Sequence, residues 1–251
     1  MPKWTAEDGS QIEYETEGDI EKPALLLLPG LLGTIASQWQ PFAKTLSASF
    51  YVIMSDLRGH GRSTNTAKEL NPETMMFDIS GLLDSLNVTA VHIAGYSLGG
   101  YLGLMLALKE PRRVSTLLMH ASKFYWTKDA ADKMHQQLDP DMMAKKVPTY
   151  ADQLMQDHGA RQWRILVRQA ADLTNYLVEN GISERMAVHT QCRVLVSVGD
   201  RDELVPVNEA LRLARLFNKG ELIVLPGVRH PFQTVRPIPL IPTMQFFHRI
   251  V

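Results

Sequence analysis

The sequence predicts an α/β fold in which a mostly parallel sheet is flanked by helices. Short apolar runs bounded by Gly, Pro, Asp or Ser recur along the chain, as expected of strands covered on both faces. Helical patterns fall between these runs, and strands that alternate with helices favour right-handed crossovers and parallel pairing. A long helical stretch, residues 121–190, interrupts the alternation and predicts an insertion into the fold.

Six apolar runs are predicted to be buried parallel strands, at residues 24–29, 51–56, 90–95, 114–120, 193–200 and 221–227. Polar and apolar residues alternate over residues 10–18, which predicts a half-exposed edge strand. The clearest helical patterns cover residues 71–87, 98–111 and 206–220. In the first of these, Asn71 is a candidate N-cap and Pro72 takes the first helical position.

Residues 121–190 carry no good strand pattern and show several amphipathic helical patterns. We therefore predict a helical cap at 121–190 and a core made of residues 1–120 and 191–251. The insertion follows the carboxyl end of a strand, where open parallel sheets bind ligands. The alternative is a structural extension that only covers a sheet edge.

Composition narrows the classes of partner. The formal net charge is −1 and no block of like charge occurs, so neither nucleic acid nor an anionic membrane is an expected partner. The single cysteine, Cys192, excludes an internal disulfide and fits a reducing compartment. The first residues lack the apolar core of a signal peptide, and the apolar run 24–33 is too short to cross a bilayer. We expect a cytoplasmic protein without membrane insertion.

The segment "GYSLGG" places Ser97 between a predicted strand and a predicted helix. A strand that turns directly into a helix puts its apex residue at positive φ, and Gly95 and Gly99 leave room for that turn. The hydroxyl then lies at the amino end of a helix, whose partial positive charge favours an oxyanion. A plain turn is one alternative. A phosphate-binding loop is another, but no Lys-Ser/Thr pair follows the glycines.

A serine nucleophile needs a base, and the base needs a carboxylate to orient it. Of the eight histidines, His230 follows the last predicted strand, so its loop opens at the same sheet edge as Ser97. The loop after the preceding strand offers Asp200, Asp202 and Glu203. We favour Asp202, because Asp200 directly follows the strand end and is placed to cap the turn.

These residues resemble the α/β-hydrolase superfamily, in its branch with a serine nucleophile and a helical cap. The likeness rests on "LPGLLG", "DLRGHGRS", "GYSLGG", "GDRDELVP" and "PGVRHP", in the order that the family uses. It implies Ser97, Asp202 and His230 as catalytic triad, and the backbone N–H groups of Leu31 and Leu98 as oxyanion hole. The chain departs from the family at Pro29, which stands where a histidine is usual and which lacks both an imidazole and a backbone donor.

The resemblance implies hydrolysis of a small to medium carboxylic ester through an acyl-enzyme, without metal or other cofactor. Aromatic and methionine side chains in the predicted cap suggest an apolar pocket with Phe124 and Trp126 among its lining residues; plain packing is the alternative for both. Related reactions at the same triad are lactone hydrolysis, C–C bond cleavage and acyl transfer to an alcohol. A different class, a small-ligand receptor that retains the triad, also fits the pattern. The sequence carries no indication of an oligomeric state.

Overall fold

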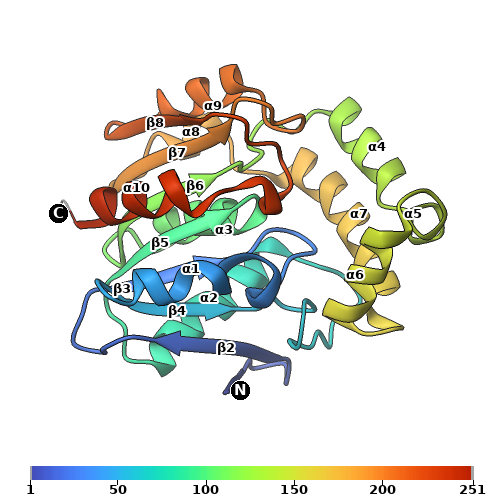
Figure 1. The fold of residues 1–251 in the computed structure, drawn as a ribbon, viewed down its shortest axis with the longest axis horizontal. Helices are drawn as coiled ribbons and strands as arrows, with labels where there is room; N and C mark the ends of the chain where they lie inside the picture. Colours follow the sequence, from blue (N-terminus) through green and yellow to red (C-terminus); the bar gives the residue numbers. More distant parts are fainter. Residues whose placement is uncertain (1, 250–251) are drawn as a thin grey trace.

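The structure is a computed structural model that describes residues 2–249. Its centre is an eight-stranded sheet with the order β1-β2-β4-β3-β5-β6-β7-β8 (Figure 1). The first two pairings, β1 with β2 and β2 with β4, are antiparallel, and all the others are parallel. The strands are β1 (Lys3–Thr5), β2 (Gln11–Glu17), β3 (Ala24–Leu28), β4 (Tyr51–Ser55), β5 (Val91–Tyr96), β6 (Val114–His120), β7 (Arg193–Gly199) and β8 (Gly220–Leu225).

Helices cover both faces of this sheet and fill the long connection between β6 and β7 (Figure 1). The α-helices are α1 (Gln40–Leu46), α2 (Pro72–Ser85), α3 (Leu98–Lys109), α4 (Lys128–Gln137), α5 (Pro140–Lys146), α6 (Pro148–His158), α7 (Gln162–Asn180), α8 (Glu184–Ala187), α9 (Val207–Ala214) and α10 (Pro237–Arg249). A short π-helix, η1 (Ile35–Trp39), precedes α1, and a 3₁₀ turn, η2 (Phe232–Thr234), precedes α10. The predicted α/β fold is confirmed.

The predicted strands are all present, but the edges of the sheet differ from the prediction. Strand β2 is not an edge strand, because the three-residue strand β1 pairs along its outer side. At the other end β8 is the edge and is largely exposed, although its sequence predicts burial on both faces. Helix α9 ends at Ala214 and is followed by turns, so it is shorter than the predicted 206–220.

The central strands are buried because consecutive side chains enter two different apolar clusters. Leu25 and Leu27 of β3 pack with α1 and α10 on one face, whereas Leu26 and Leu28 pack with α2, α3 and α9 on the other. All four leucines are fully buried. Helices on both faces explain why these strands show continuous apolar runs rather than alternation.

The segment between β6 and β7 forms the helices α4 to α8 and no strand, and every residue of it is among those that the structure describes. We call residues 121–190 the helical insertion. It contacts the loops at the carboxyl ends of the strands: His158 of α6 is hydrogen bonded to the loop after β3 and to the loop after β4. The helical insertion therefore lies over the edge of the sheet where Ser97 lies.

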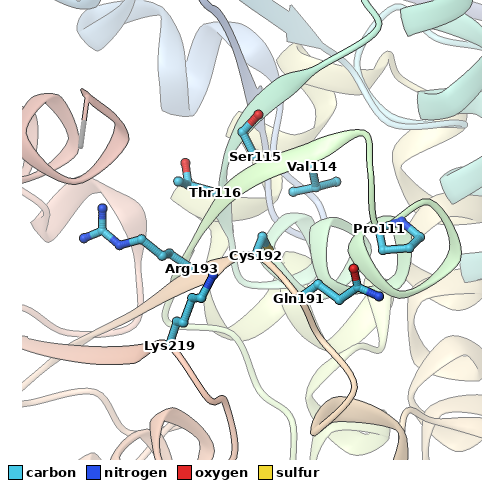
Figure 2. A pocket seen from close by; sticks show the side chains of 8 residues that line it. All are labelled: Pro111, Val114, Ser115, Thr116, Gln191, Cys192, Arg193 and Lys219. Atoms are coloured by element: carbon cyan, nitrogen blue, oxygen red, sulfur yellow. The ribbon is translucent and has the colours of Figure 1, made fainter. Parts of the chain in front are cut away.

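The opposite edge of the sheet carries a pocket of about 530 Å³. Its lining comes from the amino ends of β6 and β7 and from the residue before β8: Pro111, Val114, Ser115, Thr116, Gln191, Cys192, Arg193 and Lys219 (Figure 2). We call it the amino-edge pocket. In Figure 2 the Arg193 guanidinium extends away from the other lining side chains, and its Nη2 is paired with Glu221. Within residues 2–249, no helix is both long and apolar enough to span a bilayer.

Candidate active site

Ser97 lies at the sharp turn between β5 and α3. Its φ of 50° is in the left-handed region, which a serine adopts only where the surroundings hold it. Its N–H donates to the carbonyl of His120 at 2.8 Å, which extends the β5–β6 pairing up to the turn. A Cβ on Gly95 would lie 2.3 Å from the Gly100 nitrogen, and one on Gly99 would lie 2.3 Å from the Leu28 carbonyl oxygen. Both positions of the turn thus require glycine.

The loops after β7 and β8 bring a carboxylate and an imidazole to this turn. Nε2 of His230 lies 3.4 Å from Oγ of Ser97, and its Nδ1 lies 3.0 Å from Oδ2 of Asp202. The first distance is long for a catalytic hydrogen bond, as is common before substrate binds. The Asp202 side chain is fully buried, and its Oδ1 also accepts the N–H groups of Leu204 and Val205. The carboxylate is therefore fixed, and it favours the Nδ1–H tautomer that leaves Nε2 free to accept a proton.

The other two acidic candidates do different work. Asp200 accepts the N–H of Gly227 at 2.6 Å and ties the loop after β7 to the loop after β8. Glu203 is paired with Arg229 at the surface, and its second oxygen lies 3.4 Å from the His230 N–H. Neither carboxylate is hydrogen bonded to the His230 imidazole.

Two backbone N–H groups near the Ser97 turn, those of Leu31 and Leu98, are the predicted oxyanion-hole donors. Leu98 is the first residue of α3, so its N–H has no partner inside the helix. Leu31 lies in the loop after β3, which crosses beside the turn: a Cβ built on the neighbouring Gly30 would lie 3.1 Å from the Ser97 Cβ. Within residues 2–249, neither the Leu31 nor the Leu98 N–H makes a hydrogen bond to protein.

The loop after β3 is held without the histidine that Pro29 replaces. Oε1 of Gln38, on η1, accepts the Gly30 N–H at 2.8 Å. Oδ1 of the buried Asp56 accepts the Ile35 N–H at 2.7 Å. Burial raises the pKa of the Asp56 carboxyl to about 6, opposed by the backbone N–H groups of Ile35 and Arg62. Side chains from η1 and from the loop after β4 therefore brace this segment.

The match to known proteins covers both the sequence and the fold. Residues 23–167, more than half of the chain, match the family model described as the alpha/beta hydrolase fold. The chain belongs to the α/β-hydrolase family.

Two groups of relatives of this α/β hydrolase are similar in sequence. The putative carbamate hydrolase RutD of Agrobacterium fabrum is 28% identical over 251 residues, which cover 90% of this chain and 94% of that protein. The 3-oxoadipate enol-lactonase 2 of Acinetobacter baylyi is 32% identical over 115 residues, which cover 46% of this chain and 42% of that protein. Relatives with these names support a hydrolase.

The fold comparison agrees with the family. A thermophilic esterase from Thermogutta terrifontis superposes with a TM-score of 0.81 at 20% identity, over 99% of this chain and 98% of that one. The enol-lactonase from Burkholderia xenovorans superposes with a TM-score of 0.76 at 19% identity, over 98% and 97%. At such identities the likeness shows the fold alone.

The two aromatic residues predicted to line a pocket lie where the chain leaves β6. Phe124 is 7% exposed, belongs to the larger apolar cluster, and contacts the Tyr125 ring edge-on with centroids 5.0 Å apart. Trp126 is half-buried against the same cluster, and its Nε1 is buried without a hydrogen-bond partner among the described residues. Phe124 and Trp126 thus pack with the apolar cluster, and their role in lining a substrate pocket stays a prediction.

Several supporting residues escape the sequence patterns. Tyr96 donates its O–H to the His230 carbonyl at 2.7 Å, and its ring lies 5.6 Å from the imidazole. It occupies the variable position before Ser97, where the motif sets no residue type. Gln38 lies outside every recognised motif. Asp56 begins the recognised "DLRGHGRS", but that motif does not predict its contact with the Ile35 N–H. The described residues contain no group of three His, Cys, Asp or Glu side chains arranged to hold a metal ion.

Proposed function

We propose that this chain is a serine hydrolase that cleaves a small to medium carboxylic ester through an acyl-enzyme, with Ser97, His230 and Asp202 as catalytic triad. The observation that carries the proposal is the contact series from the Ser97 hydroxyl through the His230 imidazole to the buried Asp202 carboxylate. The strained φ of Ser97 supports it, because such strain collects at reacting groups.

In the acylation step, Nε2 of His230 takes the Ser97 proton while Oγ attacks the ester carbonyl carbon. The carbonyl π electrons move to oxygen, and the oxyanion accepts hydrogen bonds from the N–H groups of Leu31 and Leu98. The tetrahedral centre then collapses, the bond to the alcohol oxygen breaks, and the imidazolium donates its proton to that oxygen. Asp202 stabilises the imidazolium without taking its proton.

Deacylation repeats these steps with water as nucleophile. His230 removes a proton from water, the hydroxide oxygen attacks the acyl carbon, and the same two N–H groups stabilise the second oxyanion. Breakdown of this centre returns the proton to the Ser97 oxygen and releases the carboxylic acid. We assign the helical insertion the role of a cap, because His158 anchors it to the loop after β3, which carries Leu31, and to the loop after β4.

Lactone hydrolysis is the second candidate. The enol-lactonase relatives favour it, and a lactone is an internal ester that the same attack opens. The carbamate hydrolase relatives extend the candidates to an ester-like carbonyl with nitrogen on its other side. All three substrate classes share the attack on an sp² carbonyl carbon and the oxyanion that follows.

A substrate panel tests the proposal. It contains p-nitrophenyl esters of increasing chain length, a five- and a six-membered lactone, and an N-alkyl carbamate ester. We expect sustained turnover on short or medium esters and its inhibition by a serine-directed organophosphate. Release of one product equivalent followed by a stop would instead identify a receptor that retains the triad. Sustained turnover that survives complete organophosphate labelling of Ser97 would contradict the proposed nucleophile.

A further inference from the structure

The loop that carries Leu31 is held by a residue of the helical insertion. His158 is the last residue of α6 and is buried, with 5% of its surface exposed. Its Nδ1 accepts the Gly61 N–H at 2.7 Å, and its Nε2 lies 3.1 Å from the Leu32 carbonyl oxygen. One side chain thus joins the insertion to the loop after β3 and to the loop after β4.

These two contacts define the state of the ring. A backbone N–H can only donate and a carbonyl can only accept, so Nδ1 must be unprotonated and Nε2 must carry the hydrogen. Only the neutral Nε2–H tautomer satisfies both partners. Burial lowers the pKa of His158, which favours the same neutral form, and the ring of His60 packs against it edge-on with centroids 5.9 Å apart.

The contact between His158 and the Leu32 carbonyl sets the direction of the Leu31 N–H through two planar peptide groups. The Leu32 carbonyl and the Gly33 N–H belong to one peptide, and that N–H donates to the Gly30 carbonyl at 2.9 Å. The Gly30 carbonyl belongs in turn to the same peptide as the Leu31 N–H. Because a trans peptide is planar, its carbonyl and its N–H point in opposite directions. Fixing the Leu32 carbonyl therefore fixes the direction of the Leu31 N–H.

The conformation of Leu32 shows that this loop needs to be held. Its φ is 62°, in the left-handed region that a branched leucine rarely adopts. A residue in such a conformation persists only when its surroundings over-determine it. Without a donor at the Leu32 carbonyl, rotation about the Leu32 N–Cα bond would relieve the strain, move that carbonyl and break the turn to Gly30.

From these contacts we infer that His158 is a positioning residue for the oxyanion hole: it holds the Leu32 carbonyl so that the Leu31 N–H faces the Ser97 hydroxyl. The inference rests on the proposed hydrolysis at Ser97. It assigns the helical insertion a part in stabilising the transition state, in addition to covering the site.

Two near-isosteric variants separate the two bonds of His158. In His158→Asn the side-chain oxygen takes the place of Nδ1, so the bond from Gly61 is kept and the bond to Leu32 is lost. In His158→Gln the side-chain amide takes the place of Nε2, so the bond to Leu32 is kept and the bond from Gly61 is lost. His92→Asn is the control, because His92 is a buried histidine at the opposite edge of the sheet whose hydrogen bond is made through Nδ1.

We expect His158→Asn to lower kcat about 10- to 100-fold with little change in KM, somewhat less than the loss of an entire oxyanion-hole donor. His158→Gln should keep most of kcat, and His92→Asn all of it. The affinity for a trifluoromethyl ketone, which forms an oxyanion on Ser97, should fall in parallel with kcat/KM. Equal kcat in the Asn and Gln variants, or a change in KM alone, would overturn the inference.

A second readout does not depend on turnover. Hydrogen exchange of the peptide spanning residues 29–37 should be faster in His158→Asn than in wild type and His158→Gln, and ¹⁵N spectra of wild type should show His158 as the neutral Nε2–H tautomer. A wild type without esterase activity would refute the proposed function, while these measurements would still test whether His158 holds the Leu32 carbonyl. Unchanged hydrogen exchange in His158→Asn, or an Nδ1–H tautomer of His158 in wild type, would refute the positioning role of His158 even in an active enzyme.

Discussion

The amino and carboxyl edges of the sheet, where the parallel strands begin and end, each bring a hydroxyl into contact with an imidazole. Only the carboxyl edge has the features of an active site. At the amino edge Oγ1 of Thr116 lies 2.7 Å from Nδ1 of His92 and 2.6 Å from Nδ1 of His248. At the carboxyl edge Oγ of Ser97 lies 3.4 Å from Nε2 of His230. By contact distance alone, the hydroxyl and imidazoles at the amino edge would be the better candidates for a nucleophile and its base.

The surroundings separate the two pairs. Thr116 and His248 are almost completely buried, and within residues 2–249 no carboxylate is paired with His92 or His248. At the carboxyl edge the His230 side chain is 20% exposed and has Asp202 behind it. A base must gain a proton in the reaction, and it can do so only where a carboxylate stabilises the cation and where substrate can approach.

The largest contrast is expected from removing each hydroxyl. Ser97→Ala should lower kcat on the order of 10⁶-fold, since the nucleophile is lost. Thr116→Val should leave kcat unchanged and reduce the free energy of unfolding by about 1–3 kcal/mol, because two imidazoles lose a buried partner. Ester turnover and urea unfolding of both variants make the comparison. A Thr116→Val variant that is stable but inactive would place the reaction at the amino edge and contradict the proposed site at Ser97.

The next contrast is between two carboxylates on one loop. Asp202→Asn should lower kcat by about 10⁴-fold, because the amide no longer stabilises the imidazolium or its correct tautomer. Asp200→Asn should cost little activity, since Asp200 only holds the Gly227 N–H. Steady-state kinetics on the best ester measures both. If Asp200→Asn proved the more damaging change, the assignment of the orienting carboxylate would be reversed.

The contacts between Ser97, His230 and Asp202 could be predicted from the sequence, because each residue lies in a recognisable motif. Ser97 lies in a strand–turn–helix pattern, and the positions of Asp202 and His230 follow from the loops that open at the same edge. The supports of the site could not be predicted in this way. Gln38, Tyr96 and His158 act through contacts between segments far apart in the sequence, and their residue types carry no periodic or spacing signal.

The misjudged parts of the fold have separate causes. Strand β1 has three residues, too few for an alternation to be recognised. The edge position of β8 is a property of the sheet order, which apolar content does not report. The π-helix η1 and helix α1 together cover 35–46, where Pro41 and polar residues hide the helical period.

The smallest expected effect concerns how the free energy of unfolding depends on pH. Burial lowers the pKa of five histidines: His60 (to about 3), His120 (to about 4), His92, His158 and His248. The unfolded chain binds protons at these positions below about pH 6.5 while the folded chain does not, so their stabilisation is complete above that pH and is lost as pH falls. Asp56 and Asp78, whose pKa values are raised by burial, act in the opposite direction but are two groups against five.

We therefore expect the free energy of unfolding to fall by several kcal/mol from pH 7 to pH 5. The variant His248→Gln, at the amino edge, cannot titrate and should show a slope smaller by up to about 1.4 kcal/mol per pH unit. Denaturant unfolding at several pH values measures both slopes. Identical slopes would mean that His248 is not held neutral in the folded chain.

In the proposed mechanism Ser97 becomes acylated during turnover, and this step can be measured directly. Wild type is mixed with p-nitrophenyl acetate, quenched with acid within milliseconds, digested and analysed by peptide mass spectrometry, with Ser97→Ala as control. We expect one acetyl group on the peptide that contains Ser97, formed at the rate of the p-nitrophenol burst and absent from the control. Acetylation at another residue with the same kinetics, or full turnover by the control, would contradict the proposed mechanism.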